Sequence, residues 1–194
     1  MKKHYLITLI FLLLFSFIHS QTVTETENFD TAADGNVYST ASDSTPSGFW
    51  NGSADDNASV GGWQAQNGTT PTGYSSWNTG PSSANSGAYY AYTETSDPDG
   101  SASFILQSDT FNTSAGADDT SMSFYYHMNG SNVGTLYVEG STDGGTTWDQ
   151  SLWSKTGAVQ SAESDAFIQV ISGVNSFSSI PATINKLRFR YVGG

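Results

Sequence analysis

The chain has 194 residues, with 6 lysine and arginine residues against 18 aspartate and glutamate residues, and it contains no cysteine. The acidic balance disfavours binding to nucleic acid and to anionic membrane surfaces, because both require several cationic contacts. The absence of cysteine excludes disulfides, thiolate nucleophiles and cysteine-ligated zinc.

Residues 1–20 have the pattern of a secretory signal peptide. Lys2 and Lys3 form a basic start, 14 almost entirely apolar residues follow at 5–18, and Ser20 is a small residue at the cut. The alternative is a retained membrane anchor, but a spanning helix needs about 20 apolar residues. Cleavage leaves four basic against 18 acidic residues, a net charge of −14. We therefore expect a secreted, extracellular or cell-surface protein with no membrane insertion after signal cleavage.

The rest of the chain predicts an all-β domain. Short alternating, β-branched or aromatic stretches recur between glycine, serine, asparagine and aspartate clusters, and no helical repeat is found. The predicted strands are 23–30, 88–95, 102–108, 120–128, 134–141, 147–155, 167–171 and 184–192. Residues 41–87 predict long loops with short strands, pinned to the domain by tryptophans, with a disordered linker as the alternative.

The strand predicted at 120–128 alternates most clearly. Its two faces carry Met122, Phe124, Tyr126 and Met128 on one side and Ser121, Ser123, Tyr125 and His127 on the other. Successive side chains of a strand point to opposite faces, so the first set is expected over a core.

The last predicted strand, 184–192, alternates in the same way. Its inward face is expected to carry Leu187, Phe189 and Tyr191. Arg188 and Arg190 are expected to face out.

Residues 141–148, Ser-Thr-Asp-Gly-Gly-Thr-Thr-Trp, fit the Asp-box pattern Ser-x-Asp-x-Gly-x-Thr-Trp between two predicted strands. We expect a hairpin turn in which the Asp143 carboxylate accepts backbone N–H groups, a glycine takes a positive φ, and Trp148 folds back over the loop. Asp-boxes occur in sialidases, but there they are structural turns remote from the catalytic centre. The motif therefore indicates a turn rather than a glycosidase.

Four consecutive segments together resemble the MAM domain, which is named for meprin, A5 protein and receptor phosphatase mu. They are the aromatic strand at 122–130, the Gly-Thr-Leu-x-Val strand within 133–138, the turn at 141–148 and the Trp-x-x-x-Gly ending within 152–157. Further pieces in the family's order lie at 28–30, 77–81, 87–96, 102–108 and 186–191. The resemblance implies a jelly-roll-like antiparallel β-sandwich over residues 21–194.

The chain departs from the family pattern in two ways. Animal members usually carry four cysteines in two disulfides, so here the apolar core and strand pairing must suffice. Members also continue into an Ile-Ala-x-Asp-Asp-Ile strand, whereas this chain ends at Gly194. We expect a domain truncated at its C-terminal strand, a fragment of a longer protein that unfolds readily because a sheet edge is unpaired. A cooperative melt well above ambient temperature would contradict this expectation.

The resemblance implies a non-catalytic extracellular adhesion or recognition module that binds protein or carbohydrate partners. The alternative is an accessory, targeting domain of a secreted hydrolase, such as a peptidase, whose catalytic domain lies beyond residue 194. With no cysteine and only His127 left after cleavage, the enzyme class that remains is a two-carboxylate glycosidase. We expect no catalysis from this segment.

Three carboxylates are candidate calcium ligands. Oxygen ligands suit Ca²⁺, and extracellular modules need only weak sites. Asp30 is expected to end the first strand, where the missing final strand would supply partners. Asp97 and Asp99 lie two residues apart in Ser-Asp-Pro-Asp-Gly, for which a plain turn is the alternative.

Trp50, Trp63 and Trp77 are candidate ligand-binding residues that could stack on sugars. The alternative is packing beneath long loops. For His127 we expect a structural role on the strand face opposite the core.

Overall fold

The computed structural model describes residues 25–32, 37–38, 43–53, 62–71, 79–94, 103–111, 120–174 and 176–194. These residues form ten strands and no helix. The strands are β1 Val37–Tyr38, β2 Trp50–Gly52, β3 Trp63–Asn67, β4 Tyr89–Tyr92, β5 Ser103–Ser108, β6 Ser123–Tyr126, β7 Thr135–Ser141, β8 Gln150–Thr156, β9 Ile168–Ile171 and β10 Lys186–Val192. The predicted signal peptide lies outside the described residues.

The larger sheet has five antiparallel strands in the order β2-β5-β10-β7-β8. In its centre Phe189 of β10 lies opposite Leu106 of β5 and Val138 of β7. Cross-strand partners share a face of a sheet. The register therefore collects apolar side chains from three strands onto one surface, as the alternation of β10 predicted.

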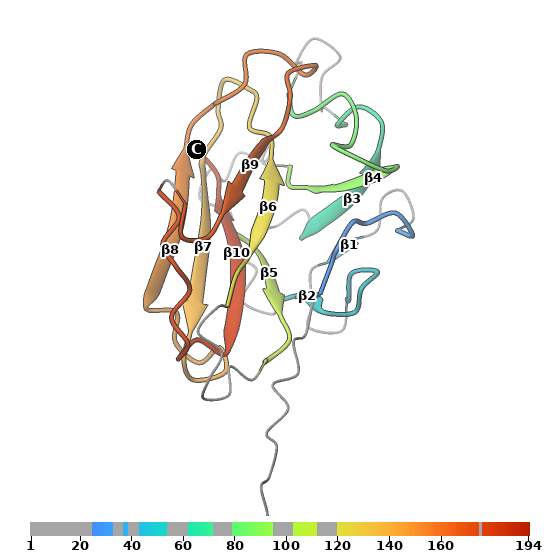
Figure 1. Ribbon diagram of the computed structural model, residues 1–194. Coiled ribbons are helices and arrows are strands. Elements are labelled where there is room, and N and C mark those ends of the chain that lie inside the picture. The colour runs from blue at the N-terminus through green and yellow to red at the C-terminus, as the bar shows by residue number, and fades with distance from the viewer. Residues whose placement is uncertain are drawn as a thin grey trace, which may run out of the picture.

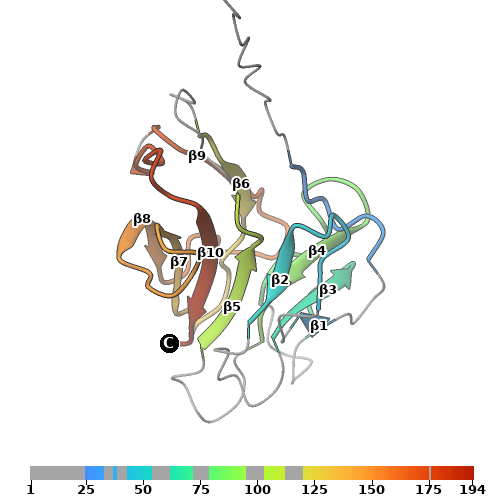
Figure 2. The ribbon, with the colours of Figure 1, turned by 90° about the horizontal axis from the view of Figure 1, so that it is seen from below.

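The second layer consists of two smaller antiparallel sheets, β6-β9 and β1-β3-β4. Figure 1 shows β6 and β9 in front of β10 and β7. Figure 2 shows β1, β3 and β4 beside β2 at the other side of the molecule. The chain is therefore an all-β antiparallel sandwich of the jelly-roll class, as predicted.

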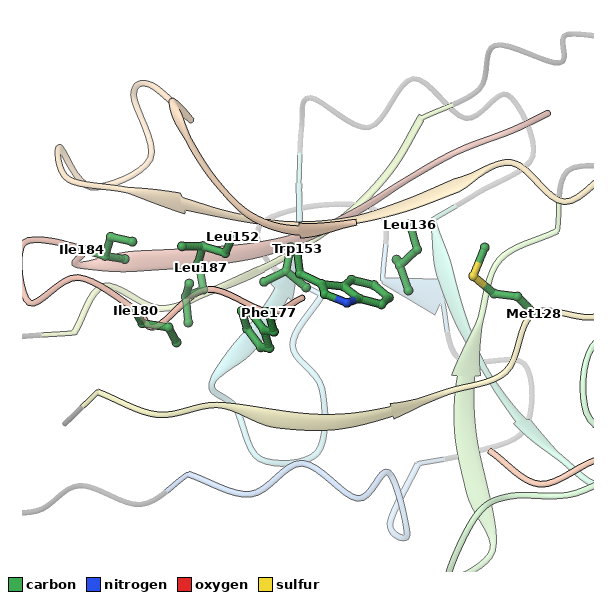
Figure 3. Close-up of a cluster of buried hydrophobic side chains, with 9 residues drawn as sticks. Met128, Leu136, Leu152, Trp153, Phe177, Ile180, Ile184 and Leu187 are labelled. Atoms are coloured by element: carbon green, nitrogen blue, oxygen red, sulfur yellow. The ribbon is translucent and has the colours of Figure 1, made fainter. Parts of the chain in front are cut away.

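The main core lies between the five-stranded sheet and β6-β9 (Figure 3). Val138 and Ile184 are fully buried there, and Phe124 and Tyr126 of β6 pack against this cluster. The Phe124 ring meets Trp153 edge-on, with ring centroids 5.3 Å apart. The predicted inward face of β6 is therefore confirmed, while Tyr125 on its other face is exposed.

The strand predicted at 23–30 is wrong over its described part, because residues 25–30 form no strand. Side-chain oxygens here bind the backbone instead: Glu27 Oε1 accepts the Phe29 N–H at 2.8 Å, and Asn28 Oδ1 accepts the Asp30 N–H at 3.1 Å. Phe29 has a φ of 57°. Local bonds of this kind compete with a strand ladder, so Asp30 does not end a strand.

The remaining predicted strands are present with shifted ends. β8 begins at Gln150 rather than at 147, because Thr147 is hydrogen-bonded into the preceding turn. Within 41–87 the structure has β2 and β3, two of the short strands expected there.

Arg188 and Arg190 lie on the sheet face away from the core, as predicted, but they are not solvated. Their side chains are only 14% and 23% exposed, because both are ion-paired to Glu139 on β7. The alternation of β10 predicted the direction of these side chains and not their burial.

Candidate functional site

The β7–β8 turn, residues 141–148, is held together by Asp143 and Ser141. Asp143 Oδ1 accepts the Thr147 N–H at 2.9 Å, and Oδ2 accepts the Thr147 hydroxyl at 2.8 Å. Ser141 Oγ donates to Asp143 Oδ1 and accepts the Gly145 N–H at 2.8 Å. Gly144 and Gly145 have φ values of 74° and 95°. These are the carboxylate bonds and glycine conformations expected for this turn.

Hydrogen bonds from the Thr147 backbone, then from the Ser141 and Thr147 hydroxyls, lower the pKa of Asp143 to about 2. The carboxylate is therefore ionised at neutral pH with both oxygens bound within the turn. A general acid needs a proton to give, so this carboxyl group is suited to holding the turn and not to acid catalysis.

The outer face of the five-stranded sheet carries a cluster of cationic and aromatic side chains around Glu139. Arg188 Nε donates to Glu139 Oε2 at 2.7 Å, and Arg190 Nη2 donates to Oε1 at 2.6 Å. The two guanidinium groups also lie over aromatic rings, Arg188 at 4.4 Å from Trp148 and Arg190 at 4.1 Å from Tyr137. Trp148 thus folds back onto the sheet beside the turn that it ends.

Opposing effects act on the Glu139 carboxyl group. Burial raises its pKa, but hydrogen bonds from Arg190 and Arg188, together with their charges, outweigh burial and lower the pKa below its usual value. Glu139 is therefore ionised and compensated, which makes this cluster a structural one.

Asp30, the first candidate calcium ligand, pins the N-terminal segment to the loop before β4. Its Oδ1 accepts the Ala88 N–H at 3.0 Å. Across the described residues, no three carboxylate or imidazole side chains gather closely enough to hold a metal ion. Asp97 and Asp99 lie outside the described residues. Calcium binding by these carboxylates stays a prediction.

Trp50 and Trp63 are partly buried against the two apolar clusters. The Trp50 ring lies 5.2 Å from Phe189 and the Trp63 ring 6.3 Å from it, centroid to centroid. These contacts are those expected of the packing alternative. Trp77 lies outside the described residues.

His127 follows β6 on the strand face opposite the core, as expected. Its ring lies 5.3 Å from the Phe167 ring, and both ring nitrogens are buried without a hydrogen-bond partner. Burial lowers the pKa of His127. The backbone of Ala162 and the carboxylate of Asp165 oppose this shift, but they approach the ring without making a hydrogen bond.

A cavity of about 300 Å³ is lined mainly by the connection between β8 and β9, which lies at the upper end of the molecule in Figure 1. Six residues line it: Ser82, Asn129, Ser161, Ala162, Glu163 and Ser164. Sequence reasoning missed this site. The only local signal was a polar stretch, Gln-Ser-Ala-Glu-Ser-Asp, at 160–165 between two predicted strands.

The cavity walls are fixed by hydrogen bonds between three loops. Ser82 N donates to the Glu163 carbonyl at 3.0 Å, and Gly80 N donates to the Asn129 carbonyl at 3.0 Å. Ser82 is thereby tied to Glu163, and Asn129 to Gly80 of the loop that carries Ser82, although these residues come from distant parts of the chain.

Fold and sites together define, over the described residues, a β-sandwich module with polar turns and a small cavity between loops. Comparison with protein families is specific: the model of the MAM domain, meprin/A5/mu, matches residues 42–170. The chain belongs to the MAM domain family. No curated protein matches it. The matched residues run from the segment before β2 through most of β9.

MAM domains are extracellular adhesion-type modules without catalytic activity, and they occur in extracellular or surface proteins. In the part of the chain that the structure describes, no helix has the length and apolar character needed to cross a membrane.

Proposed function

We propose that this chain is a recognition module of a secreted or surface-displayed protein, and that it binds an extracellular protein or carbohydrate. Its membership of the MAM family carries the proposal. Two features of the chain support it. The charged groups with shifted pKa values at Asp143 and Glu139 are bound within the fold, and the net charge of the sequence disfavours nucleic acid as a partner.

An array experiment tests this function. The purified, fluorescently labelled protein is incubated with immobilised glycans and extracellular proteins, and the same preparation after unfolding serves as the control. Retention of the folded protein alone on at least one spot is the expected result. Equal retention of folded and unfolded protein, or none on any spot, would refute the proposal.

We propose in addition that Ca²⁺ binds weakly at Asp30, as an oxygen ligand site of the kind that extracellular modules use. The array is therefore run with calcium and with a chelator. A thermal shift of the protein on calcium addition, lost in Asp30→Asn, supports the site. An unchanged melting temperature in calcium would refute the proposed calcium site without affecting the recognition function.

A further inference from the structure

We propose that the cavity lined by Ser82, Asn129, Ser161, Ala162, Glu163 and Ser164 binds a neutral saccharide through the sugar hydroxyl groups. This inference rests on the proposed recognition function and assigns its ligand class and its site.

The loop that supplies most of the lining is rigidly held. Asp165 Oδ2 accepts three bonds from the loop: the Ser161 N–H at 2.8 Å, the Ser161 hydroxyl at 3.1 Å and the Ala162 N–H at 2.9 Å. Gln160, only 6% exposed, accepts the Met128 N–H through Oε1 and donates to the Ala166 carbonyl through Nε2. A site formed in advance spares the ligand the cost of ordering it.

Three polar side chains of the lining are available to a ligand. In the described part of the chain, the hydroxyls of Ser82 and Ser164 and the carboxylate of Glu163 make no side-chain hydrogen bond. Ser161 donates its hydroxyl proton to Asp165 and keeps its acceptor positions. Hydroxyls both donate and accept, and a carboxylate accepts at two oxygens. This set matches a ligand that carries several adjacent hydroxyl groups.

The charge of the lining selects against other ligand classes. Glu163 is the only charged side chain of the lining, and Asp165 of the same loop is hydrogen-bonded to Ser161, so an anion meets two negative charges and no positive one. Ala162 is the one apolar side chain of the lining, and carbon atoms of the other lining residues add apolar surface that the carbon face of a sugar ring can contact. A metal ion finds a single carboxylate in this lining, that of Glu163. A neutral polyhydroxyl compound is the class that remains.

An NMR titration tests the site directly. The ¹⁵N-labelled protein is titrated with the methyl glycosides of glucose, galactose and mannose, and separately with methyl glucuronide as the anionic comparison. A small open site holding one sugar ring implies a Kd on the order of 10⁻³ M. We expect saturable shifts at residues 129 and 161–164 with at least one neutral glycoside. The His127 ring signal should move with them, because Ala162 and Asp165 of the same loop flank that ring.

Matched variants connect these shifts to the carboxylate. Glu163→Gln removes a charged acceptor and should weaken binding about tenfold. Asp149→Asn makes the same charge change on the exposed β7–β8 connection, at the opposite end of the molecule in Figure 1, and should leave binding unchanged. Both variants should keep the fold, which the dispersion of the NMR spectrum shows.

Four results would overturn the inference. The first is that residues 161–164 show no shifts with any neutral glycoside at about ten times the expected Kd, and the second is that methyl glucuronide binds as tightly or more tightly. The third is that Glu163→Gln and Asp149→Asn weaken binding equally. The fourth is an array on which Glu163→Gln abolishes retention on a protein spot while no sugar binds. If Glu163→Gln leaves retention on the array intact, the cavity is excluded as the binding site and the recognition function stands. An array without any retention would remove the recognition function itself.

Discussion

Replacement of Glu139 by glutamine removes a negative charge that is paired with two arginine side chains on the outer face of the large sheet. Glu139 is 7% exposed, and its two oxygens accept three N–H bonds, two from Arg190 and one from Arg188. Glutamine has nearly the same shape, so the substitution tests the charge and leaves no cavity.

The expected loss of stability follows from the burial of these groups. Removing one partner of a buried ion pair costs more than the pair itself contributes, because the remaining charge stays desolvated. The side chains of Arg188 and Arg190 are 14% and 23% exposed and can partly turn toward water. We therefore expect the free energy of unfolding to fall by about 2–3 kcal/mol. For a domain of this size the melting temperature should fall by about 4–12 °C.

Urea unfolding followed by tryptophan fluorescence measures this change, since Trp148 and Trp153 lie on or beside the sheet. Asp149→Asn is the matched control, an exposed carboxylate on the adjacent connection, and it should change stability by less than about 0.5 kcal/mol. The pH gives a second measurement. The pKa of Glu139 is lowered, so its contribution to stability is present above pH 4.5 and is lost as the pH falls below that value. Glu139→Gln should therefore lose less stability in acid than the wild type does.

A double-mutant cycle separates the ion pair from general damage. Arg190→Met and Glu139→Gln together should cost less than the sum of the two single losses, by more than about 0.5 kcal/mol. Additive losses, or a Glu139→Gln midpoint equal to that of the wild type, would refute the reasoning.

Three further predictions concern the turn, the histidine and one glycine. Asp143→Asn should lower stability at neutral pH and remove a loss that the wild type shows as the pH falls from 3.8 through about 2, measured by urea midpoints across that range. Because the pKa of His127 is lowered, its contribution to stability is present above pH 6.5 and is lost as the pH falls below that value. In His127→Gln the melting temperature should therefore depend less on pH below 6.5. A wild type that melts at a higher temperature at acid pH would contradict this. In Gly134→Val the new side chain would collide with the backbone carbonyl of Val192, so we expect the free energy of unfolding to fall by about 3 kcal/mol or more, measured by circular dichroism melts. Gly173→Ala is the comparison and should cost about 1 kcal/mol, because its positive φ is strained but the space around it is open.

The sequence by itself determined the class of fold and much of the local structure. Alternation along 122–128 predicted which side chains of β6 enter the core, because successive strand residues point to opposite faces whatever the strand pairs with. The order Ser141, Asp143, Gly145, Thr147 predicted the hydrogen bonds of the β7–β8 turn, because they join residues at most four positions apart. The same ordered segments carried the resemblance to the family whose model matches the chain.

Where local patterns compete, or where distant residues meet, only the tertiary structure decided. The sequence led us to expect a strand through 25–30, but side-chain oxygens of Glu27 and Asn28 accept the N–H groups of Phe29 and Asp30. The burial of Arg188 and Arg190 depends on the register that places Glu139 beside them, 49 and 51 residues away in sequence. The cavity joins residue 82, residue 129 and the loop 161–164. No local sequence pattern encodes these long-range contacts, since they follow from how loops close over a packed core.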